Sequence, residues 1–346
     1  QVFLGWLPGG LAVVAFVTCA FFTAFTGASG VTIVAVGALL LPALVQAGYP
    51  EKFSLGLVTT SGSLGLLLAP SLPLIIYGVI VQQMDLPLPF TIQELFIAGT
   101  LPALLMIVLL TGYSIWVTRG APIVRGSYTR ADALAAVKAS RWEIPMPILV
   151  LGGIYSGYFA VSEAAAVTAF YVLLVEVVIH GEVKVKSLPK IIRESMIMVG
   201  GILLILGVSL AFTNFLIDSE VPQALFAWIQ TFVSDKLTFL ILLNIVLLVL
   251  GAILDIFSAL VIMIPLIVPM AIGFGVDPVH LGIIFLANMQ IGYFTPPIGM
   301  NLFIASYRFK RSITELYRAT LPFMAVLIIA LLIITYVPAV SLVFLD

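Results

Sequence analysis

The chain contains a succession of apolar stretches long enough to cross a lipid bilayer. Inside the hydrocarbon layer the backbone has no water to bind, so only helices and closed barrels can span it. Several of these stretches exceed the roughly 18 apolar residues that mark a spanning helix. Charged residues make up 9% of the chain and hydrophobic residues 62%, whereas an ordinary soluble domain is about 25% charged. The sequence therefore predicts an all-α polytopic membrane protein.

The distribution of basic residues predicts the orientation of the chain. Thirteen of the fifteen Lys and Arg residues fall in three segments, 119–141, 184–193 and 308–318. Because cytoplasmic loops carry an excess of Lys and Arg, we expect these segments to face the cytoplasm. The single cysteine, Cys19, excludes a disulfide framework and a cysteine metal cluster.

Two pairs of apolar stretches are joined by very short polar tips. Residues 10–47 are interrupted by "TGASG" at 26–30, and residues 237–274 by "LDIFS" at 254–258. The second pair begins and ends next to acidic residues on the expected outer side, so both of its ends lie on one face of the membrane. A re-entrant hairpin, whose tip stops inside the membrane, fits this pattern. The alternative is a pair of full spanning helices with a minimal loop.

Two further stretches carry prolines at their middle. "LLAPS" at 67–71 and "TPPIG" at 295–299 interrupt apolar runs. A proline inside a helix costs about 3 kcal/mol and frees a backbone carbonyl, which lipid cannot satisfy. We therefore expect these breaks to be buried or to bind a ligand. The alternative is that the prolines only kink their helices, since proline is common in spanning helices.

The two halves of the chain share a spacing of prolines and glycines. Four pairs lie 227 residues apart: Pro42 and Pro269, Gly48 and Gly275, Gly65 and Gly292, Pro70 and Pro297. The helix after the first hairpin runs outward and the one after the second runs inward, so the repeats are inverted in topology. Inverted repeats with broken helices at mid-membrane are typical of secondary transporters. Half-helix ends and freed carbonyls would form two small-cation sites, with room for an anionic substrate between them.

These motifs resemble those of the large membrane subunit of TRAP (tripartite ATP-independent periplasmic) transporters, the DctM-type family. The resemblance covers essentially the whole chain and rests on "SGSLGLLLAPSLPLIIYG" at 61–78, "ILDIFSALVIMIPLIVP" at 253–269 and "TPPIGMNLF" at 295–303, together with "GGLA" near the start and "GGIYSGYFAVSEAAAV" at 152–167. It implies an elevator-type symporter driven by a sodium gradient, in the cytoplasmic (inner) membrane of a bacterium or archaeon. It also implies a soluble extracytoplasmic substrate-binding protein and a small membrane subunit as partners. No nucleic acid and no cofactor beyond the coupling Na⁺ are expected.

The offset of 227 residues between the two halves predicts how the chain is organised. It also predicts that an N-terminal portion is lacking. The first inverted repeat covers 1–118, with a re-entrant hairpin at 10–47, a broken helix at 53–83 and a helix at 95–118. An amphipathic cytoplasmic connector follows at 119–144. The second repeat covers 145–346, with scaffold helices at 145–216, an interfacial arm at 219–235, a hairpin at 237–274, a broken helix at 279–307 and a helix at 319–345.

Candidate site residues lie at the tips and the breaks. We expect Na⁺ to be bound by Thr26, Gly27, Ser29, Gly65, Ala69, Asp255, Ser258, Thr295, Pro296 and Gly299, and substrate to contact Ser71, Asn301 and Asn214. Oxygen ligands suit a hard cation such as Na⁺, and a charged residue at mid-membrane is costly unless it is partnered. Asp255 could instead cap the following half-helix. The small residues of the first tip could serve close helix packing, and Asn214 could satisfy a neighbouring backbone group.

The function predicted is sodium-coupled import of a small organic anion, such as a carboxylate. The alternative is a standalone cation-coupled carboxylate transporter that needs no binding protein. An enzyme is disfavoured because the sequence contains no His-Glu-x-x-His and no Gly-x-Ser-x-Gly motif, and no pairing of a catalytic Cys with His. Breaks in an inverted pair of repeats also suit alternating access better than a channel.

Overall fold

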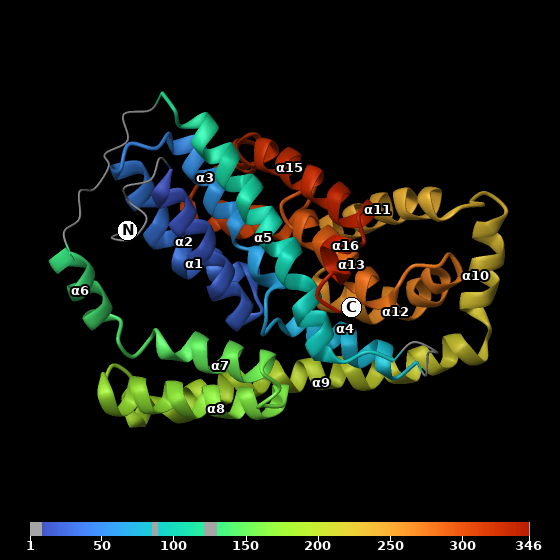
Figure 1. Cartoon of the computed structure of the whole chain (residues 1–346), viewed down its shortest axis with the longest axis horizontal. Helices are drawn as coiled ribbons and strands as arrows, with labels where there is room; N and C mark the ends of the chain where they lie inside the picture. Colours follow the sequence, from blue (N-terminus) through green and yellow to red (C-terminus); the bar gives the residue numbers. More distant parts are fainter. Residues whose placement is uncertain (1–8, 85–88, 121–129, 346) are drawn as a thin grey trace. The chain divides into compact units, whose positions relative to one another are not determined.

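The computed structural model describes residues 9–84, 89–120 and 130–345, and it contains no strand within them. The chain divides into two compact units (Figure 1). Unit 1 comprises Gln1–Tyr128 and Leu216–Asp346, and unit 2 comprises Thr129–Phe215. This division does not follow the expected boundary between the repeats, because unit 2 holds residues 129–144 of the expected connector and the first helices of the expected second repeat.

Unit 1 begins with a hairpin of two helices, α1 (Gly10–Thr26) and α2 (Ser29–Gln46). Only Gly27 and Ala28 separate them, and Gly27 adopts the left-handed conformation with φ of 67°. A side chain at Gly27 would lie 3.0 Å from Cβ of Leu72, at the start of α4. The tip of this hairpin therefore packs directly against the first broken helix.

The first broken helix consists of α3 (Glu51–Ser61), a single 3-10 turn η1 (Leu64–Leu67) and α4 (Leu72–Gln82). Across the break, the Ser71 hydroxyl donates to the carbonyl of Leu66 at 2.6 Å. This bond satisfies one of the carbonyls that the break exposes. The long helix α5 (Ile92–Val117) follows, and a capping box of Thr91 and Glu94 fixes its start.

The second half of unit 1 repeats this order. An arm helix, α10 (Val221–Gln230), precedes the hairpin of α11 (Lys236–Ile253) and α12 (Ile256–Gly273). The second broken helix consists of α13 (Pro278–Gly292) and α14 (Met300–Phe309). The final helices are α15 (Ile313–Tyr336) and the short α16 (Ala339–Leu342). Helix α15 begins six residues before the expected start at 319, because Ser312 accepts a hydrogen bond from the Glu315 amide and caps it.

The correspondence between the halves extends to individual residues. The bounds of α12 are those of α2 shifted by 227 residues. The hydroxyl of Ser63 donates to the carbonyl of Gln290 at 3.1 Å, and these two residues are themselves 227 positions apart. Each is therefore bonded to its own counterpart, which places an approximate two-fold axis of the repeats at this contact. The peptide bonds Ala69-Pro70 and Pro296-Pro297 are both cis and are related by the same shift.

Unit 2 holds the helices expected to form a scaffold. Its elements are α6 (Arg130–Ala139), α7 (Pro145–Tyr155), α8 (Val161–Leu174), the π-helical turn η2 (Val175–Ile179), the 3-10 turn η3 (Val185–Ser187) and all but the end of α9 (Leu188–Asp218). Helices α7 and α8 are separated by a turn in which Phe159 packs over Gly153. Glu163 caps α8 by accepting a hydrogen bond from the Ala160 amide at 2.9 Å. Part of the expected connector, residues 121–129, lies outside the described residues.

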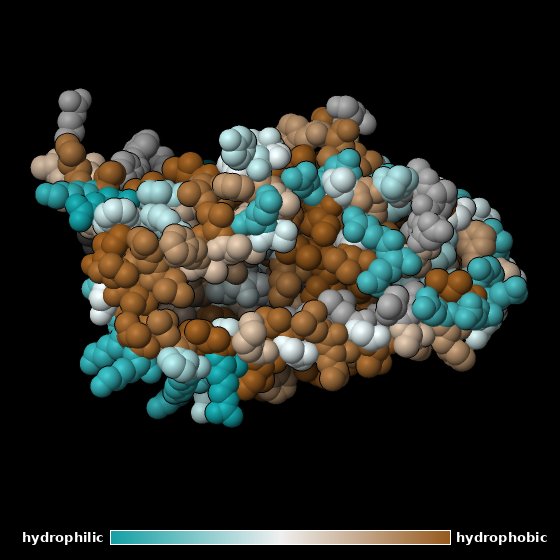
Figure 2. All heavy atoms as spheres, turned by 90° about the horizontal axis from the view of Figure 1, so that it is seen from below, coloured by the Kyte–Doolittle hydropathy of each residue, from teal (hydrophilic) through white to brown (hydrophobic). Residues whose placement is uncertain are grey.

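The exposed surface suits a bilayer. Among the described residues, seven segments are long and apolar enough to cross a membrane. Large hydrophobic side chains such as Leu39 (75% exposed) and Phe170 (71%) face outward. Figure 2 shows hydrophobic residues over much of the face in view, between separate groups of hydrophilic ones. Polar residues such as Asn288, Gln290 and Asn301 are instead fully buried.

Candidate functional site

Both hairpin tips open onto one cavity in unit 1. The cavity has a volume of about 600 Å³, which is within the range of small-molecule sites. Its lining comes from the first tip and α2, the second tip, and the second break with α14: Gly27, Ala28, Ser29, Gly30, Val31, Val34, Ala35, Asp255, Ile256, Phe257, Tyr293, Met300 and Ile304. Segments more than 200 residues apart in the sequence thus form a single site.

The second tip presents a carboxylate. Asp255 immediately precedes α12, and its Oδ1 accepts hydrogen bonds from the amides of Phe257 at 2.9 Å and Ser258 at 3.1 Å. The hydroxyl of Ser258 donates to the other oxygen, Oδ2. Asp255 therefore caps α12, as a carboxylate at a helix N-terminus commonly does. It is half-buried and lines the cavity.

The first tip carries no such cap. Ala28 occupies the position equivalent to Asp255, and no side chain accepts a hydrogen bond from the first turn of α2. The next residue, Ser29, is 4% exposed and donates its hydroxyl to Oδ1 of Asn301 at 2.8 Å. The two tips therefore differ in charge at equivalent positions, with a carboxylate at one and uncapped amides at the other.

The second break is fixed by bonds to the second hairpin. The Tyr293 hydroxyl accepts a hydrogen bond from the Ile256 amide at 2.7 Å, and the Gly299 amide donates to the Ala252 carbonyl at 3.0 Å. A side chain at Gly292 would lie 2.5 Å from Cα of Gly251, so the two helices touch through their backbones. The break is thus held against the tip that carries Asp255.

The first break lies against the first hairpin in the same way. A side chain at Gly65 would lie 2.0 Å from the Ala20 carbonyl oxygen and 2.5 Å from the Ala24 amide. Ala24 is the counterpart of Gly251, so the packing of hairpin on break is repeated. Ala69 is 3% exposed and Ser71 is 1% exposed, and neither lines the cavity.

Three of the expected site residues, Gly27, Ser29 and Asp255, line the cavity. Asn301 is fully buried behind Ser29, and Ser258 is bonded to Asp255. The remaining expected residues of unit 1 lie at the tips and breaks without lining the cavity: Thr26, Gly65, Ala69, Ser71, Thr295, Pro296 and Gly299. The hydroxyl of Thr26 donates to the Phe22 carbonyl at 2.9 Å, and that of Thr295 donates to the Ile291 carbonyl at 2.8 Å. Asn214 is exposed on α9 and belongs to unit 2.

Sequence reasoning did not single out Tyr293 or the apolar wall of Met300 and Ile304. Tyr293 is 4% exposed, and its hydroxyl bonds the backbone of the opposite tip. A signal was available, because a tyrosine directly before a helix break has a polar end that needs a partner when buried. The partner itself could not be found from the sequence.

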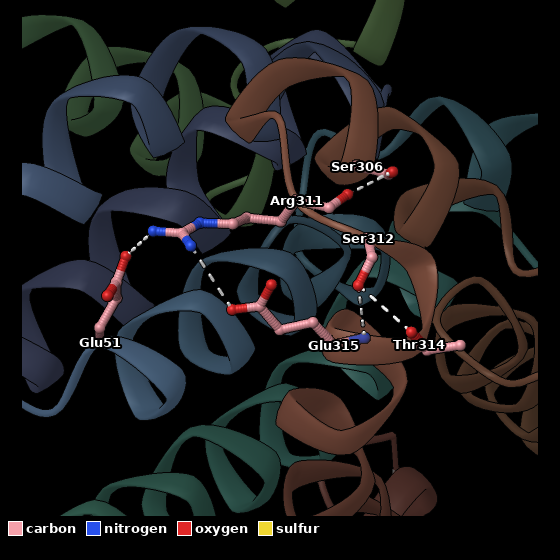
Figure 3. A network of polar contacts seen from close by, with 6 residues as sticks. All are labelled: Glu51, Ser306, Arg311, Ser312, Thr314 and Glu315. Carbon is pink, nitrogen blue, oxygen red and sulfur yellow. Dashed lines mark hydrogen bonds and ion pairs between the residues drawn. The ribbon is translucent and has the colours of Figure 1, made fainter.

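Away from the cavity, an exposed network joins the start of α3 to the start of α15. The guanidinium of Arg311 pairs with Glu51 and, at 3.8 Å, with Glu315, and Figure 3 shows its side chain extending between the two carboxylates. The Ser306 hydroxyl donates to the Arg311 carbonyl at 2.6 Å. Exposed ion pairs each contribute about 0–1 kcal/mol, so this network serves local geometry more than overall stability.

A buried network links the second hairpin to its neighbours. The Asn288 amide nitrogen donates to Oδ1 of Asn244 at 2.7 Å, and the Asn244 amide nitrogen donates to the Thr335 hydroxyl at 3.2 Å. These side chains connect α13, α11 and α15. Buried polar groups of this kind fix the relative placement of helices, because leaving one unpaired costs about 1–3 kcal/mol.

Comparison with known proteins gives consistent matches. The family described as "Tripartite ATP-independent periplasmic transporter, DctM component" matches residues 1–340. The chain is 36% identical to the isethionate TRAP transporter permease protein DctMQ of Oleidesulfovibrio alaskensis, over 99% of this chain and 53% of that protein. It is 34% identical to the C4-dicarboxylate TRAP transporter large permease protein DctM of Pseudomonas aeruginosa, over 98% of this chain and 78% of that protein.

A more distant relative and a solved structure agree with these matches. The ectoine TRAP transporter large permease protein TeaC of Halomonas elongata is 30% identical over 99% of this chain and 79% of its own length. The fold is similar to the crystal structure of the Alcanivorax borkumensis YdaH transporter, with a TM-score of 0.62 and 16% identity over 95% of this chain and 81% of that one. The chain therefore belongs to the DctM family of TRAP transporters and is a large permease subunit, a transport protein rather than an enzyme.

Proposed function

We propose that the chain imports a small organic anion, such as a carboxylate, by sodium-coupled symport through the cavity between the hairpin tips. The observation that carries this proposal is the meeting of both tips and the second break at one cavity of about 600 Å³. The import would take place across a bacterial or archaeal cytoplasmic membrane. A soluble extracytoplasmic binding protein would deliver the substrate, and a small membrane subunit would complete the complex.

The first tip provides for the negative charge of the substrate. The amides in the first turn of a helix have no partner within the helix, and the helix dipole favours an anion there. At α2 these amides lack a side-chain cap, because Ala28 stands where the second tip has Asp255. A carboxylate in the cavity can therefore take the place that Asp255 takes at α12.

The second tip provides for the coupling cation. Asp255 is the one carboxylate among the cavity's lining residues, and Ser258 is bonded to it. The carbonyls of the second break, at Thr295, Pro296 and Gly299, follow Gly292 in the chain, and Gly292 touches Gly251 of the second hairpin. Oxygen atoms of these types suit Na⁺. In this proposal Na⁺ offsets the charge of Asp255 when the anion enters.

The relatives support an organic acid as the substrate. Two of them are an isethionate and a C4-dicarboxylate TRAP transporter permease, and both compounds are organic anions. One of these relatives is a DctMQ protein, which agrees with a requirement for a second membrane component. The match to the DctM family over residues 1–340 does not favour the standalone carboxylate transporter.

Uptake by the reconstituted complex tests the proposal. The chain and its small membrane subunit would be reconstituted into liposomes, and the soluble binding protein would be added outside. Uptake of radiolabelled carboxylates and isethionate would then be measured. We expect uptake only with an inward sodium gradient and with the binding protein present. Uptake that is unchanged when choline replaces sodium would contradict the symport, and uptake without the binding protein would support the standalone alternative.

A further inference from the structure

The walls of the cavity determine which organic anions it can accept. Apart from glycine and alanine, most of the lining side chains are hydrocarbon or thioether, namely Val31, Val34, Ile256, Phe257, Met300 and Ile304. None of the lining residues, all of which lie in the described part of the chain, is Lys or Arg. The cavity therefore offers apolar surface and no fixed positive side chain.

The three polar side chains of the lining are already engaged with protein groups. Ser29 donates to Asn301 at 2.8 Å, and the Tyr293 hydroxyl accepts from the Ile256 amide at 2.7 Å. Asp255 accepts from the amides that follow it. Among these three side chains, the donor left for a second polar end of a substrate is thus the proton of the Tyr293 hydroxyl, while a long apolar wall remains.

The apolar wall is built from two helices that touch closely. A side chain at Gly30 would lie 2.5 Å from Cδ1 of Ile304, so α2 and α14 meet at this point. Val31 and Val34 on α2 are 45% and 44% exposed, and both face the cavity. A hydrocarbon chain placed along this wall would cover them.

Resting on the function proposed above, we infer that the substrate is an organic monoanion with a hydrocarbon body, and that a dianion of the same length is disfavoured. A single carboxylate accepts hydrogen bonds from the uncapped amides of the first tip, and the remainder of the molecule lies along Val31, Val34 and Ile304. A second carboxylate would instead lie against this wall, where no lining side chain is basic. Burying a charge against apolar surface without a partner is costly.

Binding of matched acids tests the inference. The purified permease with its small membrane subunit, in lipid nanodiscs, would be titrated calorimetrically with butanoate, hexanoate, succinate and adipate, in sodium chloride and in choline chloride. We expect butanoate to bind at least about tenfold more tightly than succinate, and hexanoate likewise more tightly than adipate. Each methylene added to the monoanion should strengthen binding about fourfold, since burying it contributes about 0.8 kcal/mol.

Two variants on α2 provide the matched control. Val34→Ala shortens the apolar wall and should weaken hexanoate binding about fourfold or more. Val45→Ala removes the same atoms from a similarly exposed residue of the same helix, 40% exposed and outside the cavity, and should change nothing. Equal effects of the two substitutions would overturn the assignment of this wall to substrate.

The outcomes separate this inference from the function on which it rests. If none of the four acids binds in sodium chloride while the reconstituted complex takes up another organic anion such as isethionate, the function stands and the inference is overturned; if the complex takes up no organic anion, the function itself is contradicted. If succinate and adipate bind as tightly as the monoanions and require sodium, the function stands and the inference is overturned. If the dependence on chain length is the same in choline chloride, the acids are partitioning into an apolar groove as lipids do, which also overturns the inference.

Discussion

Asp255 has a structural task whether or not an ion binds beside it. Its carboxylate holds the amides of Phe257 and Ser258, and so fixes the first turn of α12 at the wall of the cavity. Asp277 performs the same task for α13, where its Oδ1 accepts from the amides of Val279 at 2.8 Å and His280 at 3.1 Å. The two residues share their capping geometry, but only Asp255 lines the cavity. This pair makes it possible to separate capping from ion binding.

The substitution Asp255→Asn should weaken the sodium dependence of uptake without unfolding the protein. Asparagine caps a helix about as well as aspartate does, so the melting temperature should change little. The loss of a charge beside the cation should raise the sodium concentration for half-maximal uptake by about tenfold, equivalent to about 1.4 kcal/mol. Sodium titrations of uptake in proteoliposomes measure this value.

Asp277→Asn is the control for this experiment. It makes the same chemical change at an equivalent cap outside the cavity, and it should leave the sodium titration as in the wild type. An Asp255→Asn protein whose sodium dependence matches that of the control would show that Asp255 is only a helix cap.

At the scale of elements, each hairpin is joined to its broken helix through glycine. Gly65 lies against the backbone of α1, and Gly292 lies against the backbone of α11. No side chain can be accommodated at either position unless the two helices move apart. Close backbone contact of this type is common where helices pack inside a membrane, and here it sets the distance between a tip and its break.

The substitutions Gly65→Ala and Gly292→Ala should each destabilise the fold. The added Cβ would meet backbone atoms at 2.0 Å and 2.5 Å, respectively, and overpacking costs about 1–3 kcal/mol. Gly112→Ala is the matched control, because it lies within α5 with nothing inside 4 Å of the added carbon. The control should stabilise its helix by about 0.5–1 kcal/mol. Thermal unfolding in detergent measures all three, and a loss of stability in Gly112→Ala equal to the others would contradict the packing argument.

Much of this element order could be predicted from the sequence, because the residues that break helices and form turns act locally. The prolines at 70, 296 and 297 and the tips at 26–30 and 254–258 coincide with the observed breaks and turns. The start of α15 at Ile313 could not be found from hydropathy, because polar residues around the Ser312 cap precede the apolar run. The bond between Tyr293 and Ile256 also escaped prediction, since it depends on how two separate elements pack.

At the scale of the whole molecule, inverted repeats predict that the two hairpins enter from opposite faces of the membrane. The basic segment at 308–318 and the arm around α10 should therefore lie on opposite sides. The native Cys19 is fully buried, so it should remain unlabelled by aqueous thiol reagents. Cysteines introduced at the surface can then report on sidedness.

Single-cysteine labelling should distinguish the two faces. Gln230 and Arg318 are both exposed, and Gln230→Cys should react with a membrane-impermeant maleimide added to intact cells. Arg318→Cys should react only after the membrane has been permeabilised. Labelling of both positions in intact cells, or of Arg318→Cys alone, would contradict the inverted topology.

The bond between Ser63 and Gln290 joins two equivalent positions of the two halves. Elsewhere in the molecule, the duplicated halves are free to diverge, as Ala28 and Asp255 have done, because each copy has surroundings of its own. At the two-fold axis this freedom is lost, because a residue substituted in one half is in direct contact with the equivalent position of the other half. The bond joins the hydroxyl of Ser63 to the backbone carbonyl of Gln290, so the loss of that hydroxyl has to be accommodated by the opposite half.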